Sequence, residues 1–265
     1  FHKMNKLAIV GCGRLAEIVA DAIINGILPE YELTGVYSRS AAKVNYLANK
    51  MQQYNKACKA CYSLDELLSL KPDYLVETAS PMAMKELAIK TLENGTSIIT
   101  LSIGAFADTE FYNEVKRVAT QNNTRVYIAS GATGGFDVLR TASLMGNASA
   151  RFFNEKGPAA LRRSVVYQPT LETEKTIVFS GTAREAIGVF PTGLNVSVAA
   201  SLASVGPEKM HVTMQSTPGF TGDTQRVEIK NDQVHAVVDV YSATPEIAGW
   251  SVVSTLLNIV SPIVF

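Results

Sequence analysis

The chain has 265 residues, enough for one large hydrophobic core or two smaller ones. Its 24 basic residues balance its 24 acidic ones, which gives no sign of a surface for nucleic acid or another polyanion. Hydrophobic residues make up 47% of the chain, but no apolar run approaches the roughly 20 residues that a membrane-spanning helix needs. We therefore expect a soluble protein whose partners include neither nucleic acid nor membrane.

Three cysteines are present, and the spacing of Cys58 and Cys61 occurs in metal sites and redox pairs. A structural zinc ion would need two further ligands, and the three histidines of the chain lie singly. We expect Cys12, Cys58 and Cys61 to be reduced thiols in a cytoplasmic protein, with no metal bound.

The first residues are short and polar, unlike a signal peptide. Phe1-His2-Lys3 precede Met4, and we expect these three residues to be an appended segment without a role in function.

Residues 7–10 form an apolar run that is followed by glycines. Such a run is typical of a parallel strand buried on both faces. Gly11 would permit a tight turn, Gly13 would let the backbone approach a pyrophosphate, and Ala16 would let the next helix lie close to the strand. The free amides at the start of that helix would then face the phosphates. With a strand at 33–37 the pattern predicts a dinucleotide-binding βαβ unit; the alternative is a tight turn in another α/β protein.

The end of the second predicted strand indicates which dinucleotide binds. An Asp or Glu there would hold the ribose hydroxyls of NAD, but the chain has Ser38 and Arg39, with Lys43 one turn later. An arginine fork suits a 2′-phosphate, so we expect NADP in preference to NAD. The alternative is that Arg39 is a solvated surface residue.

Helical and apolar segments then alternate. We expect helices over 41–62, from the cap Ser63 onward, over 81–93 and over 108–120, and strands over 74–79, 97–102 and 125–129. Ala79 and Ser80 would lie at the carboxyl end of a strand, where parallel sheets bind ligands. Residues 4–130 are thus predicted to form a doubly wound parallel sheet, a Rossmann domain.

A glycine-rich stretch over 130–137 follows, where the nicotinamide and substrate would meet; the alternative is a flexible linker. Beyond it, period-two strands at 209–214, 225–229 and 234–240 indicate a largely antiparallel sheet, with helices at 182–190 and 195–204. We expect an α+β substrate and dimerisation domain over 131–250. A last helix within 251–265 is expected to return to the first domain.

Several stretches together resemble the L-aspartate dehydrogenase family, a group of NAD(P)-dependent amino-acid dehydrogenases. They are residues 76–81, 105–108, 130–139, 178–183 and 190–196, and SGATGGFDVL at 130–139 is the most specific. The resemblance implies a homodimeric oxidoreductase acting on a CH–NH2 donor. Such enzymes oxidise L-aspartate to iminoaspartate, which hydrolyses to oxaloacetate or feeds NAD biosynthesis. By position, the family's cofactor contacts fall on Arg14, Leu15, Ala79, Ser80, Leu101, Ser102, Ala132 and Asn195.

One segment departs from the family. The family carries a D-P motif followed by N-x-H with a catalytic histidine, whereas here residues 217–225 place Gln225 at the histidine position and Asp223 at the asparagine position. Glutamine does not take a proton near neutral pH, and Asp223 would accept one only if burial disfavoured its charged form. Either Gln225 orients the substrate, the substrate is another imine, amino acid or oxo compound, or the protein binds NADP without turnover.

The carboxylates of an aspartate substrate also need cations. Arg162, Arg163 and Lys175 lie in the second domain, but an Arg-Arg pair is more often a solvated face. The lysine-bearing segment of the family is replaced here by residues 167–170, which leaves the substrate open.

Overall fold

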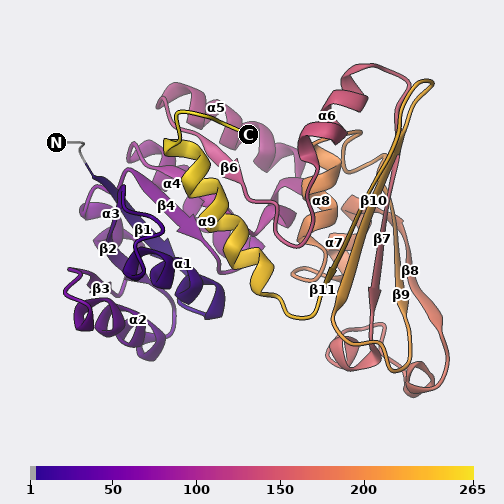
Figure 1. Cartoon of the computed structure of the whole chain (residues 1–265), viewed down its shortest axis with the longest axis horizontal. Helices are drawn as coiled ribbons and strands as arrows, with labels where there is room; N and C mark the ends of the chain where they lie inside the picture. Colours follow the sequence, from indigo (N-terminus) through magenta and orange to yellow (C-terminus); the bar gives the residue numbers. More distant parts are fainter. Residues whose placement is uncertain (1–3) are drawn as a thin grey trace. The chain divides into compact units, whose positions relative to one another are not determined.

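The computed structural model describes residues 4–265, so Phe1-His2-Lys3 lie outside the described residues. The chain divides into two compact units, shown in Figure 1. Unit 1 holds the residues up to 105, 109–129 and 248–265, and unit 2 holds 106–108 and 130–247.

Unit 1 is built on a six-stranded parallel sheet with the order β3-β2-β1-β4-β5-β6. The predicted doubly wound sheet is therefore confirmed. Its strands are β1 (Asn5–Val10), β2 (Tyr31–Tyr37), β3 (Lys59–Cys61), β4 (Tyr74–Glu77), β5 (Ser97–Thr100) and β6 (Val126–Ile128). Its helices are α1 (Arg14–Ile24), α2 (Ala41–Gln53), α3 (Leu64–Ser69), α4 (Pro81–Glu93), α5 (Thr109–Gln121) and nearly all of α9 (Glu246–Val260).

Side-chain caps explain where two of these helices begin. The Ser63 hydroxyl accepts the backbone N–H of Glu66 at 3.1 Å, as its spacing predicted, and thereby caps α3. The Ser80 hydroxyl accepts the N–H of Ala83 at 3.1 Å, and Pro81 occupies the first turn of α4, where it loses no hydrogen bond. Each cap therefore fixes the residue at which a helix begins, just after β3 for α3 and just after β4 for α4.

The predicted helix over 41–62 is wrong in its second half. Helix α2 ends at Gln53, and Asn55 has the left-handed φ of 57°, which a helix does not continue through. The chain then forms the short edge strand β3, in which Lys59 pairs with Gly35 of β2. Three residues are too few to show a strand period in the sequence.

The last helix packs on the first sheet. Val252, Val253 and Leu256 of α9 are buried in the same core as residues of β1 and α1. The Tyr31 hydroxyl donates to the carbonyl of Leu256 at 2.7 Å. No helix within the described residues is both long and apolar enough to span a membrane.

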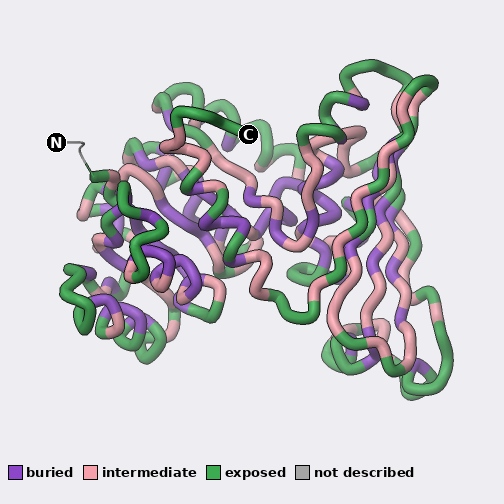
Figure 2. Tube along the Cα trace, in the orientation of Figure 1, coloured by how far each residue is buried: buried purple, intermediate pink, exposed green. Residues whose placement is uncertain are grey.

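Unit 2 is built on a five-stranded sheet with the order β11-β10-β7-β9-β8. Within the described part of the chain, β7–β9 is the one parallel pair of this sheet, so the expected largely antiparallel sheet is confirmed. Its strands are β7 (Ser149–Lys156), β8 (Thr176–Thr182), β9 (His211–Ser216), β10 (Asp223–Lys230) and β11 (His235–Ser242). Its helices are α6 (Phe136–Leu144), α7 (Ala183–Val189) and α8 (Asn195–Leu202). Buried and exposed residues alternate along several of these strands, as Figure 2 shows.

The glycine-rich stretch at the start of unit 2 is packed, not loose. Gly131 and Gly135 have left-handed φ values of 63° and 69°. A Cβ on Gly135 would lie 2.5 Å from Cγ2 of Val238, and one on Gly131 would lie 3.0 Å from Cγ1 of Val196. These glycines therefore allow a close approach within unit 2, which a flexible linker would not need.

Candidate functional site

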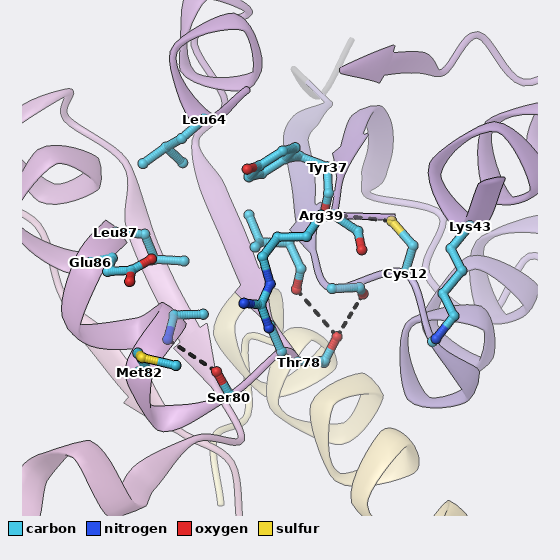
Figure 3. Close-up of a pocket in the computed structure, with 16 residues that line it drawn as sticks. Cys12, Tyr37, Arg39, Lys43, Leu64, Thr78, Ser80, Met82, Glu86 and Leu87 are labelled. Atoms are coloured by element: carbon cyan, nitrogen blue, oxygen red, sulfur yellow. Dashed lines mark hydrogen bonds between the residues drawn. The ribbon is translucent and has the colours of Figure 1, made fainter. Parts of the chain in front are cut away.

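A cavity of about 380 Å³ lies in unit 1 beside the carboxyl ends of β1, β2 and β4 (Figure 3). This is the edge at which open parallel sheets bind ligands. The cofactor residues predicted from the sequence that line it are Gly11, Gly13, Ser38, Arg39, Ala79 and Ser80. The sequence did not point to Thr78 or to the face of α4 formed by Met82, Ala83, Glu86 and Leu87, which also line it.

Gly11 makes the turn after β1 and cannot carry a side chain. Its φ is 91°, and a Cβ there would lie 2.8 Å from the backbone of Thr78 and Ala79. The Thr78 hydroxyl donates to the Gly11 carbonyl at 2.9 Å, a bond drawn in Figure 3. The glycine turn and the end of β4 are therefore fixed to each other.

Gly13 leaves the start of α1 open. It occupies the N-cap position without any side-chain hydrogen bond to the helix, and a Cβ on it would have no atom within 4 Å. The first N–H groups of α1 are thus free of a side-chain cap, next to space that a ligand can enter. Such an arrangement fits the pyrophosphate of a dinucleotide.

Cations lie on the side of the cavity formed by β2 and α2. Arg39 and Lys43 are both exposed, and among residues 4–265 neither has a carboxylate partner. In Figure 3 the Arg39 side chain extends into the cavity, while Lys43 lines it on the side of Cys12. Neither Ser38 nor Arg39 is an acid, so the end of β2 offers no carboxylate to the ribose hydroxyls.

Cys12, between the two glycines, also lines the cavity. Its thiol lies 3.6 Å from the carbonyl of Tyr37, and burial raises the pKa of the thiol to about 12. Burial likewise raises the pKa of the Cys58 thiol to about 12. All three cysteines are free, and at neutral pH Cys12 and Cys58 remain thiols, which are poor metal ligands and nucleophiles.

Four predicted cofactor residues of unit 1 do not line this cavity: Arg14, Leu15, Leu101 and Ser102. Arg14 lies 3.7 Å from the carboxylate of Glu17. Ser102 is buried, and its hydroxyl donates to Glu77 at 3.0 Å. Glu77 itself, a fully buried acid at the end of β4, was not singled out by the sequence.

The last two predicted cofactor residues belong to unit 2. Ala132 lies in the glycine-rich stretch, and Asn195 opens α8, where its side chain donates to the carbonyl of Thr192 at 3.3 Å.

Unit 2 brings the two predicted catalytic residues into one polar cluster, here called the Asp223 cluster: Asn154, Lys156, Asp223 and Gln225. Gln225 pairs with Asn154 across β10 and β7, and both side chains are buried. One carboxylate oxygen of Asp223 accepts the Asn154 amide at 2.7 Å. The other accepts the Gln225 amide at 2.6 Å and the Lys156 ammonium at 3.4 Å.

The cluster leaves two acceptors without protein partners within the described chain. Three donors, one of them a cation, bond to the Asp223 carboxylate. Both amide groups use their nitrogen on Asp223, which fixes their orientation. The amide oxygens of Asn154 and Gln225 are buried and have no hydrogen-bond partner within the described chain. These oxygens can accept a hydrogen bond from a donor such as a nitrogen.

The two histidines of unit 2 and the predicted cation Arg162 have partners outside the Asp223 cluster. The His211 ring lies 3.1 Å from the Ser180 hydroxyl, and His235 lies 2.8 Å from Glu228. Arg162 pairs with Glu172 at 3.1 Å and is exposed, as the solvated-face alternative predicted.

Two family models match successive parts of the chain. Residues 11–129 match the family model "Homoserine dehydrogenase, NAD binding domain", and residues 137–259 match "Aspartate dehydrogenase, C-terminal". The chain is 35% identical over 213 residues to an L-aspartate dehydrogenase of Methanococcus maripaludis strain C6, covering 79% of this chain and 78% of that one. It is 30% identical to the enzyme of Methanosarcina barkeri, covering 98% of both.

A solved structure gives the same result. The crystal structure of aspartate dehydrogenase from Thermotoga maritima matches with a TM-score of 0.76 at 25% identity, covering 98% of this chain and 99% of that one. The full-length relative, the C-terminal family model and the solved structure agree, and the chain belongs to the aspartate dehydrogenase family.

Proposed function

We propose that the chain is an NAD(P)-dependent oxidoreductase that oxidises L-aspartate to iminoaspartate. The Cα of the substrate loses a hydride and its nitrogen loses a proton, and water then releases oxaloacetate and ammonia. When bound, the nicotinamide ring supplies the hydride acceptor. The observation that carries the proposal is the cavity at Gly11 and Gly13, in a chain whose family acts on this amino acid.

Unit 1 would hold the cofactor. The open start of α1 would bind the pyrophosphate, and the backbone of Ala79 and Ser80 would lie against the dinucleotide. Arg14, Leu15, Leu101 and Ser102 remain proposed contacts from the family positions, as do Ala132 and Asn195 in unit 2.

NADP is the proposed cofactor rather than NAD. Ser38, Arg39 and Lys43 offer a hydroxyl and two cations without a carboxylate partner, which suits a 2′-phosphate. No acid at the end of β2 is available to hold the ribose hydroxyls of NAD.

The Asp223 cluster is the proposed substrate end of the reaction. The buried amide oxygens of Asn154 and Gln225 would accept hydrogen bonds from the substrate nitrogen and orient it. Gln225 would position the substrate, and Asp223 would fix the amide of Gln225. A proton leaving the nitrogen would pass to water, because the amide of Gln225 does not titrate.

The test is NADPH formation from NADP+ with L-aspartate at alkaline pH. L-Glutamate, L-alanine and D-aspartate serve as controls for the side chain and the configuration. Turnover with L-aspartate alone supports the proposal. Turnover with another amino acid but not with L-aspartate would contradict it.

Gln225 favours a second candidate, a reductase of another imine, amino acid or oxo compound. A glutamine at the family's histidine position changes which atoms of a substrate the site can bind or protonate. Binding of NADPH without turnover of any oxo acid plus ammonia would indicate a third, non-catalytic role.

The wider setting follows from the family. A homodimer is proposed, because soluble oligomers are mostly symmetric and the family pairs through its second domain. Light scattering on the purified chain tests it, and a monomer at micromolar concentration would contradict it. Iminoaspartate would link the reaction to NAD biosynthesis. The cytoplasm is the proposed setting, because the cysteines are free thiols.

A further inference from the structure

Glu77 is a fully buried acidic residue on a central strand of the unit 1 sheet. It is the last residue of β4, where it pairs with Val10 of β1 and Thr100 of β5. Its side chain has no exposed surface. It therefore lies near the middle of the row of strand carboxyl ends, where the loops of open parallel sheets bind ligands.

Four hydrogen-bond donors hold its carboxylate. One oxygen accepts the backbone N–H of Ala79 at 2.7 Å, the N–H of Ser80 at 3.0 Å and the Ser102 hydroxyl at 3.0 Å. The other accepts the Thr100 hydroxyl at 2.6 Å. All of these partners donate, which matches an ionised carboxylate, an acceptor at both oxygens. None of them is a cation.

Such a charge is costly to bury. Burial raises the pKa of the Glu77 carboxyl, and the four hydrogen bonds oppose that rise. A glutamine would fill the same space and could keep the acceptor for the N–H groups of Ala79 and Ser80 while donating to Thr100. Hydrogen bonding alone therefore does not require a charge at this position.

The charge lies next to the cofactor cavity, because Ala79 and Ser80, which bond to it, line that cavity. In a doubly wound sheet one half binds each nucleotide of a dinucleotide. Here Arg39 at the end of β2 belongs to the half formed by β1, β2 and β3, so the ends of β4, β5 and β6 are left for the nicotinamide half. The oxidised nicotinamide ring carries a positive charge, and the reduced ring is neutral.

We propose that Glu77 is a positioning residue that fixes the Ala79–Ser80 backbone and whose negative charge makes the site favour the oxidised cofactor over the reduced one. The inference rests on the proposed nicotinamide cofactor. Coulomb attraction across a partly buried site is strong enough to change the affinity for a cation several-fold.

The test uses the full chain and its Glu77→Gln variant. The Kd of NADP+ is measured by calorimetry and that of NADPH by its fluorescence, together with the denaturant midpoint of the cofactor-free protein. We expect the Kd of NADP+ to rise at least about threefold more than that of NADPH, while the denaturant midpoint is unchanged or higher.

Thr100→Val is the matched control, because it removes one hydrogen bond to Glu77 but keeps the charge. It should lower the denaturant midpoint and leave the ratio of the two Kd values within about twofold of the wild-type ratio. If Glu77→Gln does not fold, Glu77→Thr takes its place. A threonine hydroxyl at position 77 is uncharged and can still accept a hydrogen bond from the backbone N–H of Ala79.

Equal weakening of both cofactor forms, or no change in either, would overturn the charge effect. If the wild-type chain binds neither NADP(H) nor NAD(H), the proposed function itself fails, which is a different result from an unchanged ratio.

Discussion

The two candidate sites are built on different principles. The cofactor cavity of unit 1 is made largely of backbone: a glycine turn, an open helix start and two strand ends. The Asp223 cluster of unit 2 is made of side chains that bond to one another. A backbone site survives many sequence changes, whereas a side-chain site changes its chemistry with one residue. Cofactor binding therefore depends mainly on backbone geometry, whereas the proposed substrate chemistry depends on the side chain of Gln225.

The largest expected effect tests the backbone site. Gly11→Ala should abolish measurable NADPH binding and lower the free energy of unfolding by about 3 kcal/mol, because it adds a left-handed strain and a clash with the end of β4. Gly26→Ala is the matched control, since Gly26 has a φ of 75° but no atom near its missing Cβ. It should cost about 1 kcal/mol and leave binding intact. Fluorescence titration and urea denaturation measure both, and equal effects of the two variants would contradict the prediction.

The next effect tests the side-chain site. Gln225→His introduces a group that titrates near neutral pH, so we expect kcat with L-aspartate to rise at least about tenfold and its pH profile to gain a limb between about pH 6 and 7. Gln215→His on β9 is the control, because Gln215 bonds to Glu155 and Thr217 outside the cluster. If Gln225→His leaves both rate and pH profile unchanged, Gln225 does not stand in for a lost base.

A smaller effect separates the two cofactors. Arg39→Ala should weaken NADPH binding about tenfold to a hundredfold and NADH binding less than about threefold, because the proposed partner of the guanidinium is the 2′-phosphate, which NADH lacks. Lys116→Ala removes an equal charge from α5, outside the cavity, and should change neither. An equal loss for NADH and NADPH would mean that Arg39 contacts a part common to both cofactors.

The smallest expected effect is on the pH dependence of stability, through Glu228 of unit 2. Hydrogen bonds from Arg151 and His235 lower the pKa of the Glu228 carboxyl from 4.5 to about 2. The folded-state pKa is the lower one, so this stabilisation is present above about pH 4.5 and is lost as the pH falls toward 2. The stability difference between the wild type and Glu228→Gln, measured by denaturation, should shrink over that window. Because Glu228 is only partly buried and its partner Arg151 is exposed, the difference should be small and should fall further in salt. A difference independent of pH would contradict the pairing.

The sequence predicted the parts of unit 1 that local signals specify. The apolar run before Gly11, the cap at Ser63 and the Ser80-Pro81 pair each determine structure within a few residues. The prediction failed at 54–62, where β3 exists only because β2 offers it an edge. A strand defined by its partner leaves little trace in its own residues.

The candidate sites show the same limit. Glu77 was overlooked because its partners Thr100 and Ser102 come from the next strand, and only the sheet register brings them together. Asn154 and Lys156 were missed because the strand β7, which carries them, was not predicted. They lie about 70 residues from Asp223 in the chain, and only the pairing of β7 with β10 brings them into contact with it. Long-range polar pairs of this kind depend on the register and not on local sequence.

The most direct test of the central claim is the rate of NADPH oxidation with oxaloacetate, measured with and without ammonium and repeated with NADH. We expect oxidation that requires both oxaloacetate and ammonium and that is faster with NADPH at low cofactor concentration. NADPH binding without oxidation, or oxidation that does not require ammonium, would contradict the assignment of the Asp223 cluster to an amine-bearing substrate.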